Sequence, residues 1–349
     1  MTRRVLPGPA SSGDPSLPAT DSATVDTKEV ENFLDQMVSQ ANDASRARST
    51  RERYKHDWRQ FTHFCCMTGR HPLPADVATV VRFLAWYGMG RRTSTLRSAR
   101  AAIRLHHEMA GFLDPTTQPE ITRFLSGHAR LTGEPPRQKM ALYVHQVREL
   151  CIVLEEEGGL VASRDRAAIL LGYAAALRAS EVVAARIQDV EIVHRGLTLT
   201  IPRSKTDQEG QGQYVAVVRT ATLETCPVTA VEEWLALLKE RGCGPTDPLF
   251  PALRASGDPA LRQGRLEYRP LSTQGYRAML KQRCAAIGID PARIGGHSLR
   301  AGHATQAAEK GVDIIEIAQQ GRWKDLRKVM VYVRSGRRFT FNSSAKLGL

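Results

Sequence analysis

The stretch GHSLRAGHATQAAEKGVDIIEIAQQGRW, residues 296–323, decides how the rest of this chain is interpreted, together with Tyr332 nine residues beyond it. His297 and Arg300 are three residues apart, so on a helix they project from the same face. A helix that begins after Gly296 would also direct backbone N–H groups towards an anion. Because H-x-x-R is also an ordinary surface pair, its meaning depends on the residues that accompany it.

A second basic position lies in YAAALRASEV, residues 173–182. Arg178 ends an apolar helix there, and Glu181 follows one turn later, where its carboxylate can orient the guanidinium. A guanidinium in a cleft can hold two phosphate oxygens at once, which a lysine cannot do. Arg178 and Arg300 together could therefore neutralise both non-bridging oxygens of a phosphodiester, and stabilise the charge that builds in a pentacoordinate transition state.

Four further residues complete a site for phosphoryl transfer. Tyr332, within KVMVYVR, could be the nucleophile if nearby arginines stabilise its phenolate, although its apolar neighbours also suit a core tyrosine. Lys205 is expected to protonate the departing 5′ oxygen, and His297 to accept a proton near the tyrosine. The indole N–H of Trp323 can donate to a phosphate oxygen. This chemistry requires neither a metal ion nor a cofactor.

The charge of the chain favours a nucleic-acid partner. Lys and Arg number 49 against 36 Asp and Glu, a formal net charge of +13. The excess is concentrated, because residues 46–104 carry a net charge of +10 whereas residues 1–45 carry −4. Such a concentration is typical of a face that binds a polyanion, with a solvated basic surface as the alternative.

Other classes of protein are disfavoured. The six cysteines show no C-x-x-C spacing, so we expect reduced thiols and no zinc site. The sequence has no P-loop, no H-E-x-x-H motif, no apolar run of membrane-spanning length and no signal-peptide pattern. We expect a cytoplasmic, nucleoid-associated protein of a bacterial, phage or plasmid genome, without a cofactor, a metal or a membrane partner.

The fold class expected is mainly α with a small antiparallel β-sheet, in two domains. Residues 1–27 are interpreted as a disordered leader, 28–132 as a helical DNA-binding domain, 133–142 as a linker and 143–349 as a catalytic domain. Apolar periodicity predicts helices over 30–41, 45–69, 74–90, 93–111, 119–132, 144–157, 163–177, 228–241 and 272–287. Alternating residues over 190–218 predict two or three strands, with Lys205 at a turn.

These residues resemble the signature of the tyrosine recombinases, also called the integrase family. The family order Arg, Lys, His-x-x-Arg, His or Trp, Tyr matches Arg178, Lys205, His297, Arg300, Trp323 and Tyr332. Tryptophan stands where histidine is more common, and that choice and the spacing to Tyr332 are those of one subgroup. The motif resemblance covers about residues 165–335, whereas over 46–132 it is one of helix pattern and charge.

The resemblance implies a C-shaped, two-domain clamp on double-stranded DNA. Four protomers would bind two copies of an inverted-repeat site and exchange strands through a 3′-phosphotyrosine and a Holliday junction, without ATP. A C-terminal segment from about residue 336 would dock on a neighbouring protomer through Phe339, Phe341, Leu347 and Leu349. The expected function is site-specific recombination. The alternatives are an integrase that needs accessory factors, a type IB topoisomerase, and a catalytically idle architectural DNA-binding protein.

The residues that contact DNA are expected on the two helices that should face the groove: Arg53, Arg91, Arg92, Arg97 and Arg100. Most should contact phosphates, which fix position and carry no sequence information. Gln274 follows a helix cap at a position where, by the resemblance, a base-reading side chain stands. Its amide could pair with N6 and N7 of adenine, with a solvated glutamine as the alternative.

Overall fold

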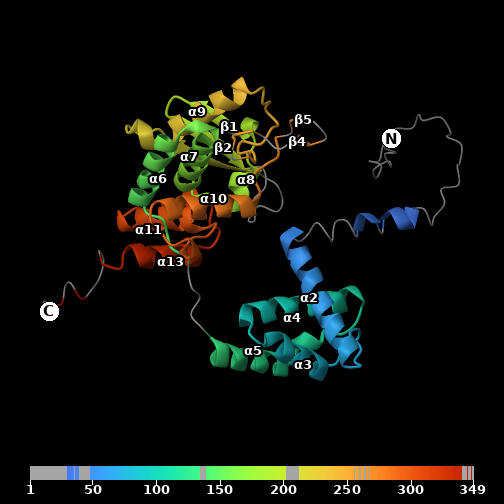
Figure 1. Cartoon of the computed structure of the whole chain (residues 1–349). Coiled ribbons are helices and arrows are strands. Elements are labelled where there is room, and N and C mark those ends of the chain that lie inside the picture. Colours follow the sequence, from blue (N-terminus) through green and yellow to red (C-terminus); the bar gives the residue numbers. More distant parts are fainter. Residues whose placement is uncertain are drawn as a thin grey trace, which may run out of the picture. The chain divides into compact units, whose positions relative to one another are not determined.

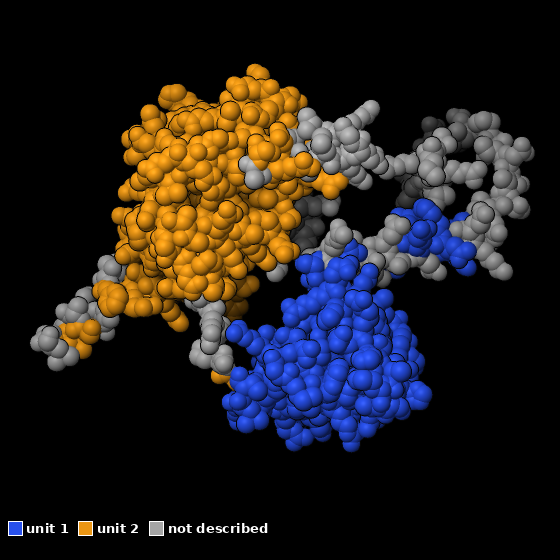
Figure 2. All heavy atoms as spheres, in the orientation of Figure 1, with its two compact units in different colours: residues 1–132 blue, residues 133–349 orange. Residues whose placement is uncertain are grey.

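The computed structural model describes residues 30–34, 36–38, 48–133, 139–201, 212–254, 256–258, 261–262, 265–266, 268–339, 344 and 347. The chain divides into two compact units, unit 1 over residues 1–132 and unit 2 over residues 133–349 (Figure 2). The fold class predicted from the sequence is confirmed, because both units are mainly helical and a small antiparallel sheet lies in the second.

Unit 1 is a cluster of helices (Figure 1): α2 (Arg48–Met67), α3 (Val77–Gly88), α4 (Thr93–Met109), the short 3₁₀ helix η1 (Pro115–Thr117) and α5 (Pro119–Thr132). Residues 30–34 and 36–38 are also helical. The aromatic stripe of α2 meets α3 in the core, where Phe61 and Phe83 are fully buried with ring centroids 5.0 Å apart. Asp76 begins α3 by accepting a hydrogen bond from the Thr79 backbone N–H.

Unit 2 contains α6 (Val144–Glu157), α7 (Gly159–Ala174), α8 (Ala179–Ala184), α9 (Pro227–Glu240), α10 (Thr273–Ala286), α11 (Ser298–Glu309), α12 (Ile314–Gly321) and α13 (Leu326–Gly336). The described residues of unit 2 also contain the 3₁₀ helices η2 (Ile187–Asp189), η3 (Leu223–Thr225) and η4 (Pro291–Arg293). Helix α7 is central, because it packs on α9 and on α11, and α13 lies against α11 (Figure 1). The second half of α7 is both apolar and buried, from Ala167 to Gly172, as expected for a helix surrounded by other elements.

The sheet of unit 2 has the strand order β1 (Val190–Val193), β2 (Gly196–Ile201) and β3 (Gln213–Val218), with antiparallel neighbours. Thr200 pairs with Tyr214, so β2 and β3 form the hairpin that the alternating sequence predicted. Residues 202–211, between these strands, lie outside the described residues. A second, two-stranded sheet joins β4 (Leu261–Arg262) to β5 (Arg265–Leu266).

The chain enters unit 2 along the start of α11. The Met140 N–H donates to the Arg293 carbonyl at 2.8 Å, and the Leu142 N–H donates to the Ser298 carbonyl at 3.0 Å. Gly302 lies where a side chain would have no room, because an added Cβ would stand 1.7 Å from the Leu142 carbonyl oxygen. Residues 140–142 therefore pack directly on the helix that begins at the His297 motif.

All six cysteines are free thiols. Within the described part of the chain, no His, Cys, Asp or Glu residues gather into a group that could hold a metal ion. Over the same residues, no helix is both long and apolar enough to cross a bilayer.

Candidate active site and DNA-contacting face

Arg300 is buried on the first turn of α11 and is only 3% exposed. Its two terminal nitrogens, Nη1 and Nη2, donate to the carbonyls of Ala176 and Gly321 respectively. Its Cζ lies 3.8 Å from the ring centroid of Trp323, a cation–π contact. Burial, with the nearby positive charge of Arg178, lowers the pKa of Arg300 to about 9, so the guanidinium remains charged at neutral pH.

Arg178 and Glu181 lie together at the start of α8. The Arg178 guanidinium donates through Nη1 to Glu181 Oε1, and the Arg178 backbone N–H donates to Glu181 Oε2 at 2.9 Å. The arginine side chain is 12% exposed and the carboxylate 2%. Among the described residues Arg178 donates from its side chain only through Nη1, so its Nε and Nη2 hydrogens remain available to an anion.

Trp323 connects the arginines to the tyrosine. Its ring centroid lies 5.7 Å from that of Tyr332, with the ring planes inclined by 49°. Tyr332 is half-buried on α13, one residue before Val333, which packs into the apolar cluster beneath. The structure therefore brings Arg300, Trp323 and Tyr332 together from three segments.

The carbonyl end of α7 explains how these segments are held. Three side chains donate to the last carbonyl of the helix, that of Ala174, and to the two carbonyls that follow it, those of Ala175 and Ala176. Gln320 donates to Ala174 at 2.9 Å, Arg322 to Ala175 at 3.1 Å, and Arg300 to Ala176. Two of these three side chains are cations, which also suit the negative end of the helix dipole.

Arg322 is a site residue that the sequence interpretation missed. It is 7% exposed, and its Nη2 donates to Glu181 Oε2 at 2.8 Å. A basic residue between a helix-ending Gly321 and Trp323 resembles a surface side chain near a helix C-terminus, so no local pattern indicates its burial. The cluster therefore contains three guanidinium groups, from Arg178, Arg300 and Arg322, and one carboxylate, from Glu181. This excess of positive charge suits an anion such as a phosphodiester.

Of the two remaining predicted catalytic residues, His297 and Lys205, only His297 is among the described residues. His297 is the exposed N-cap residue of α11 and lies just before the helix, so it does not share a helix face with the buried Arg300 as the spacing suggested. A capping residue has non-helical backbone angles, which changes the direction of its side chain. Lys205 lies outside the described residues.

In unit 1, two of the predicted DNA contacts are linked through a buried carboxylate. Asp57 of α2 is 2% exposed and accepts hydrogen bonds from Tyr87 (3.1 Å) and Ser98 (2.7 Å). Arg53 lies 4.0 Å from the same carboxylate, and Arg91 stands over the Tyr87 ring with its Cζ 4.4 Å from the centroid. Asp57 therefore ties α2, α3 and α4 together beneath the arginines.

The other predicted contacts lie on accessible surface. Arg92, at the N-cap of α4, and Arg97 are exposed, whereas Arg100 is half-buried. Gln274 is exposed at the second residue of α10, after Ser272 has capped the helix by accepting from the Gly275 N–H at 2.9 Å. Each of these side chains is free to approach a ligand from solvent.

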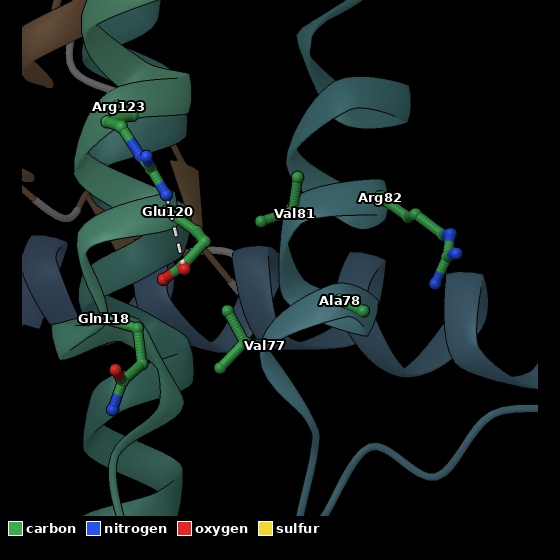
Figure 3. Close-up of a pocket in the computed structure, with 7 residues that line it drawn as sticks. All are labelled: Val77, Ala78, Val81, Arg82, Gln118, Glu120 and Arg123. Atoms are coloured by element: carbon green, nitrogen blue, oxygen red, sulfur yellow. Dashed lines mark hydrogen bonds and ion pairs between the residues drawn. The ribbon is translucent and has the colours of Figure 1, made fainter.

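An open hollow of about 700 Å³ in unit 1 contains none of the predicted site residues. It lies between α3 and α5, where Val77, Ala78 and Val81 form one wall (Figure 3). Arg123 donates to Glu120 across the other wall at 3.3 Å. The size of this hollow therefore does not indicate where the candidate active site lies.

The fold and the cluster define a mainly helical protein in which buried arginines and a tyrosine lie together, an arrangement that suits an anion such as a phosphodiester. Residues 141–338 match the phage integrase family model, and the chain belongs to that family, the tyrosine recombinases. It is 30% identical to a xerD integrase/recombinase homologue of Selenomonas ruminantium over 303 residues, which cover 86% of this chain and 85% of the relative.

Two further similarities agree. Recombinase Cre of Escherichia phage P1 is 24% identical over 293 residues, covering 79% of this chain and 81% of Cre. A lambda integrase tetramer bound to a Holliday junction has the same fold, with a TM-score of 0.54 at 14% identity, over 88% of this chain and 78% of that chain.

Proposed function

We propose that this member of the family is a Cre-like site-specific recombinase, which cleaves and rejoins DNA through a covalent bond to Tyr332. The observation that carries the proposal is the contact of the Tyr332 ring with Trp323, which in turn covers the buried guanidinium of Arg300. A tyrosine in this position has cationic neighbours that would neutralise the phosphate it attacks.

The reaction is a transesterification in which one bond forms and one breaks. The Tyr332 hydroxyl oxygen attacks phosphorus, and the bond from phosphorus to the 5′ oxygen breaks, leaving a 3′-phosphotyrosine and a 5′-hydroxyl. The phenol proton passes to His297 or to solvent, and Lys205 protonates the departing 5′ oxygen. Arg178 and Arg300 neutralise the non-bridging oxygens. Because the phosphotyrosine is itself an ester, attack by a 5′-hydroxyl of another strand reverses the step without ATP.

We extend the proposal to the partners. Double-stranded DNA with an inverted-repeat site would be bound by four protomers on two sites, and the lambda integrase tetramer on a Holliday junction supports this arrangement. The two units would form the clamp expected from the family. A C-terminal segment from about residue 336 would dock on a neighbouring protomer, and Phe339 and Leu347 of that segment are exposed. Phe341 and Leu349 lie outside the described residues.

The test uses purified protein and DNA fragments of its own replicon, without metal or ATP, quenched in detergent. Wild-type protein should form a covalent complex at one sequence, and Tyr332→Phe should form none while it retains DNA binding. Peptide mapping of the adduct should identify Tyr332. An adduct that persists in Tyr332→Phe would move the nucleophile elsewhere, for example to the exposed Tyr214.

The same experiment separates the alternatives. Covalent capture scattered over many sequences would favour a topoisomerase. Specific binding without an adduct would favour an architectural protein, whereas an adduct that appears only with a cell extract would favour an integrase that needs accessory factors.

A further inference from the structure

Arg322 occupies a backbone conformation that favours glycine. It follows the last residue of α12 with φ 56° and ψ 47°, the left-handed region in which an L side chain is strained. Helices commonly end in this conformation with a glycine. Arginine is therefore unfavourable for the backbone at this position, so we expect its side chain to have a specific role.

The side chain is also costly to bury. The guanidinium is 4% exposed, and burial lowers the pKa of Arg322 against the opposing effect of Glu181. Its Nη1 donates to the carbonyls of Ala175 and Gln320, but its buried Nε hydrogen has no partner among the described residues. An ion pair with a strained backbone and an unsatisfied donor is a poor device for stability alone.

Glu181 is the group that Arg322 controls. Burial alone would raise the pKa of Glu181, but the charge of Arg322, followed by the backbone and side chain of Arg178, outweighs it and holds the pKa below its usual value. The charge of Arg322 thus makes the largest single contribution that favours the carboxylate, and Arg178 makes several smaller ones. Arg322 and the backbone N–H of Arg178 share Oε2, while the guanidinium of Arg178 is left with Oε1.

The division of the two oxygens determines what Arg178 can offer to a substrate. A carboxylate with both oxygens free pairs with a guanidinium through two parallel N–H groups. Without Arg322, Oε2 would keep only the backbone N–H of Arg178. It could then accept a second side-chain N–H of Arg178, which would be lost to the phosphate. With Oε2 held, one N–H fixes the guanidinium and the others remain free to bind an anion.

We propose that Arg322 is a positioning residue for strand cleavage, which holds Glu181 so that Arg178 is gripped by a single N–H and presents the rest of its guanidinium to the scissile phosphate. The inference rests on the proposed function. Arg322 does not itself contact DNA, because its guanidinium is buried behind Glu181.

The test measures single-turnover cleavage of a substrate whose scissile phosphate carries a 5′-bridging sulfur. The leaving thiolate needs no proton and religates poorly, so slow variants still accumulate covalent complex. Arg322→Gly, which suits the left-handed backbone, should cleave about 100- to 1,000-fold more slowly than wild type, as expected for loss of one aligned donor. Its DNA affinity should stay within a few fold of wild type, and its Tm should stay within a few degrees of the wild-type value. Arg322→Lys, which can still reach Oε2, should recover part of the rate.

The decisive comparison uses Arg178→Ala. In that background Arg322→Gly should slow cleavage no further, because no Arg178 guanidinium remains to be positioned. If Arg322 had only a structural role, the rate reductions of the two single variants would multiply in the double variant. Equal cleavage by wild type and Arg322→Gly, or multiplied losses, would overturn the inference. Should Arg322→Gly fold poorly, Arg322→Asn, which also tolerates the left-handed region, takes its place. If wild-type protein forms no adduct on any DNA, the proposed function fails instead.

Discussion

At the residue scale, the position of Trp323 depends on the absence of a side chain at Gly321. A Cβ added to Gly321 would stand 1.7 Å from the Trp323 ring, so only glycine lets the indole fold back over the end of α12. That position places the ring both over the Arg300 guanidinium and against Tyr332. The absence of a side chain at Gly321 therefore allows Trp323 to contact both Arg300 and the proposed nucleophile, Tyr332.

His303 gives a prediction about acid stability. It lies one turn beyond Arg300, with its ring edge-on to Tyr173 at 5.8 Å. Burial, aided by the charges of Arg300 and Arg322, lowers the pKa of His303 to about 4, against 6.5 for an ordinary histidine. His303 is therefore protonated below about pH 6.5 in the unfolded chain, but only below about pH 4 in the folded chain. Stability is fully present above pH 6.5 and is lost as the pH falls towards 4.

We expect this group to remove roughly 1–2 kcal/mol of the free energy of unfolding between pH 7 and pH 5. Urea unfolding of wild type and His303→Asn at both pH values measures it, because asparagine cannot titrate. The variant should lose less stability on acidification by about that amount. Equal acid losses in the two proteins would show that other groups carry the effect.

At the element scale, local signals predicted the hairpin and many of the helices, but the ranges predicted from apolar periodicity did not include α8, α12 or α13. The helix expected over 272–287 is found as Thr273–Ala286, because its cap at Ser272 and its apolar period are both local features. The alternation that predicted the hairpin is likewise local, and β2 and β3 follow it. Local sequence patterns were thus sufficient to predict elements whose structure depends mainly on their own residues.

Tertiary contacts account for what the sequence could not predict. The left-handed turn at Arg322 exists because Glu181 and the Ala175 carbonyl, over a hundred residues away, accept from its side chain. The exposed position of His297 follows from where α11 begins, which spacing alone did not define. The candidate catalytic residues could thus be named from the sequence. Arg322, which contacts Glu181 beside Arg178, could be found only from the tertiary structure.

The packing of residues 140–142 on α11 gives a prediction at this scale. Gly302→Ala would put a Cβ 1.7 Å from the Leu142 carbonyl oxygen, a backbone atom that cannot turn away. We expect a loss of about 2–4 kcal/mol of stability, as in other overpacked sites, and a lower Tm by calorimetry. Cleavage should fall too, because the segment abuts the helix that carries Arg300.

Gly127 supplies the control, since it lies inside α5 and nothing stands within 4 Å of an added Cβ. Gly127→Ala should stabilise the protein slightly, by about 0.5–1 kcal/mol, because alanine restricts the unfolded chain. If both alanines had the same effect on Tm, the close approach at Gly302 would not be the cause.

At the scale of the whole molecule, charge is the property that most affects binding. The net charge of +13 is concentrated in residues 46–104, which form much of unit 1. Some of its exposed arginines pair with a carboxylate, as Arg123 does with Glu120, whereas Arg97 is exposed without a carboxylate partner among the described residues. Removing either kind of arginine changes the net charge by the same amount. A comparison of the two therefore distinguishes a direct contact with DNA from an effect of net charge.

Binding of the target DNA should consequently weaken steeply with salt, with log K falling by about 0.9 per log unit of salt for each phosphate contacted. Arg97→Ala on α4 should weaken binding and reduce that slope by about 1, because one phosphate contact and its counterion release are lost. Arg123→Ala on α5 removes the same charge from the wall of the hollow and should leave the slope unchanged. Fluorescence anisotropy with labelled DNA from 50 to about 300 mM salt measures both. Equal changes in slope would mean that the arginines of α2 and α4 do not form the DNA-contacting face, and that net charge alone governs binding.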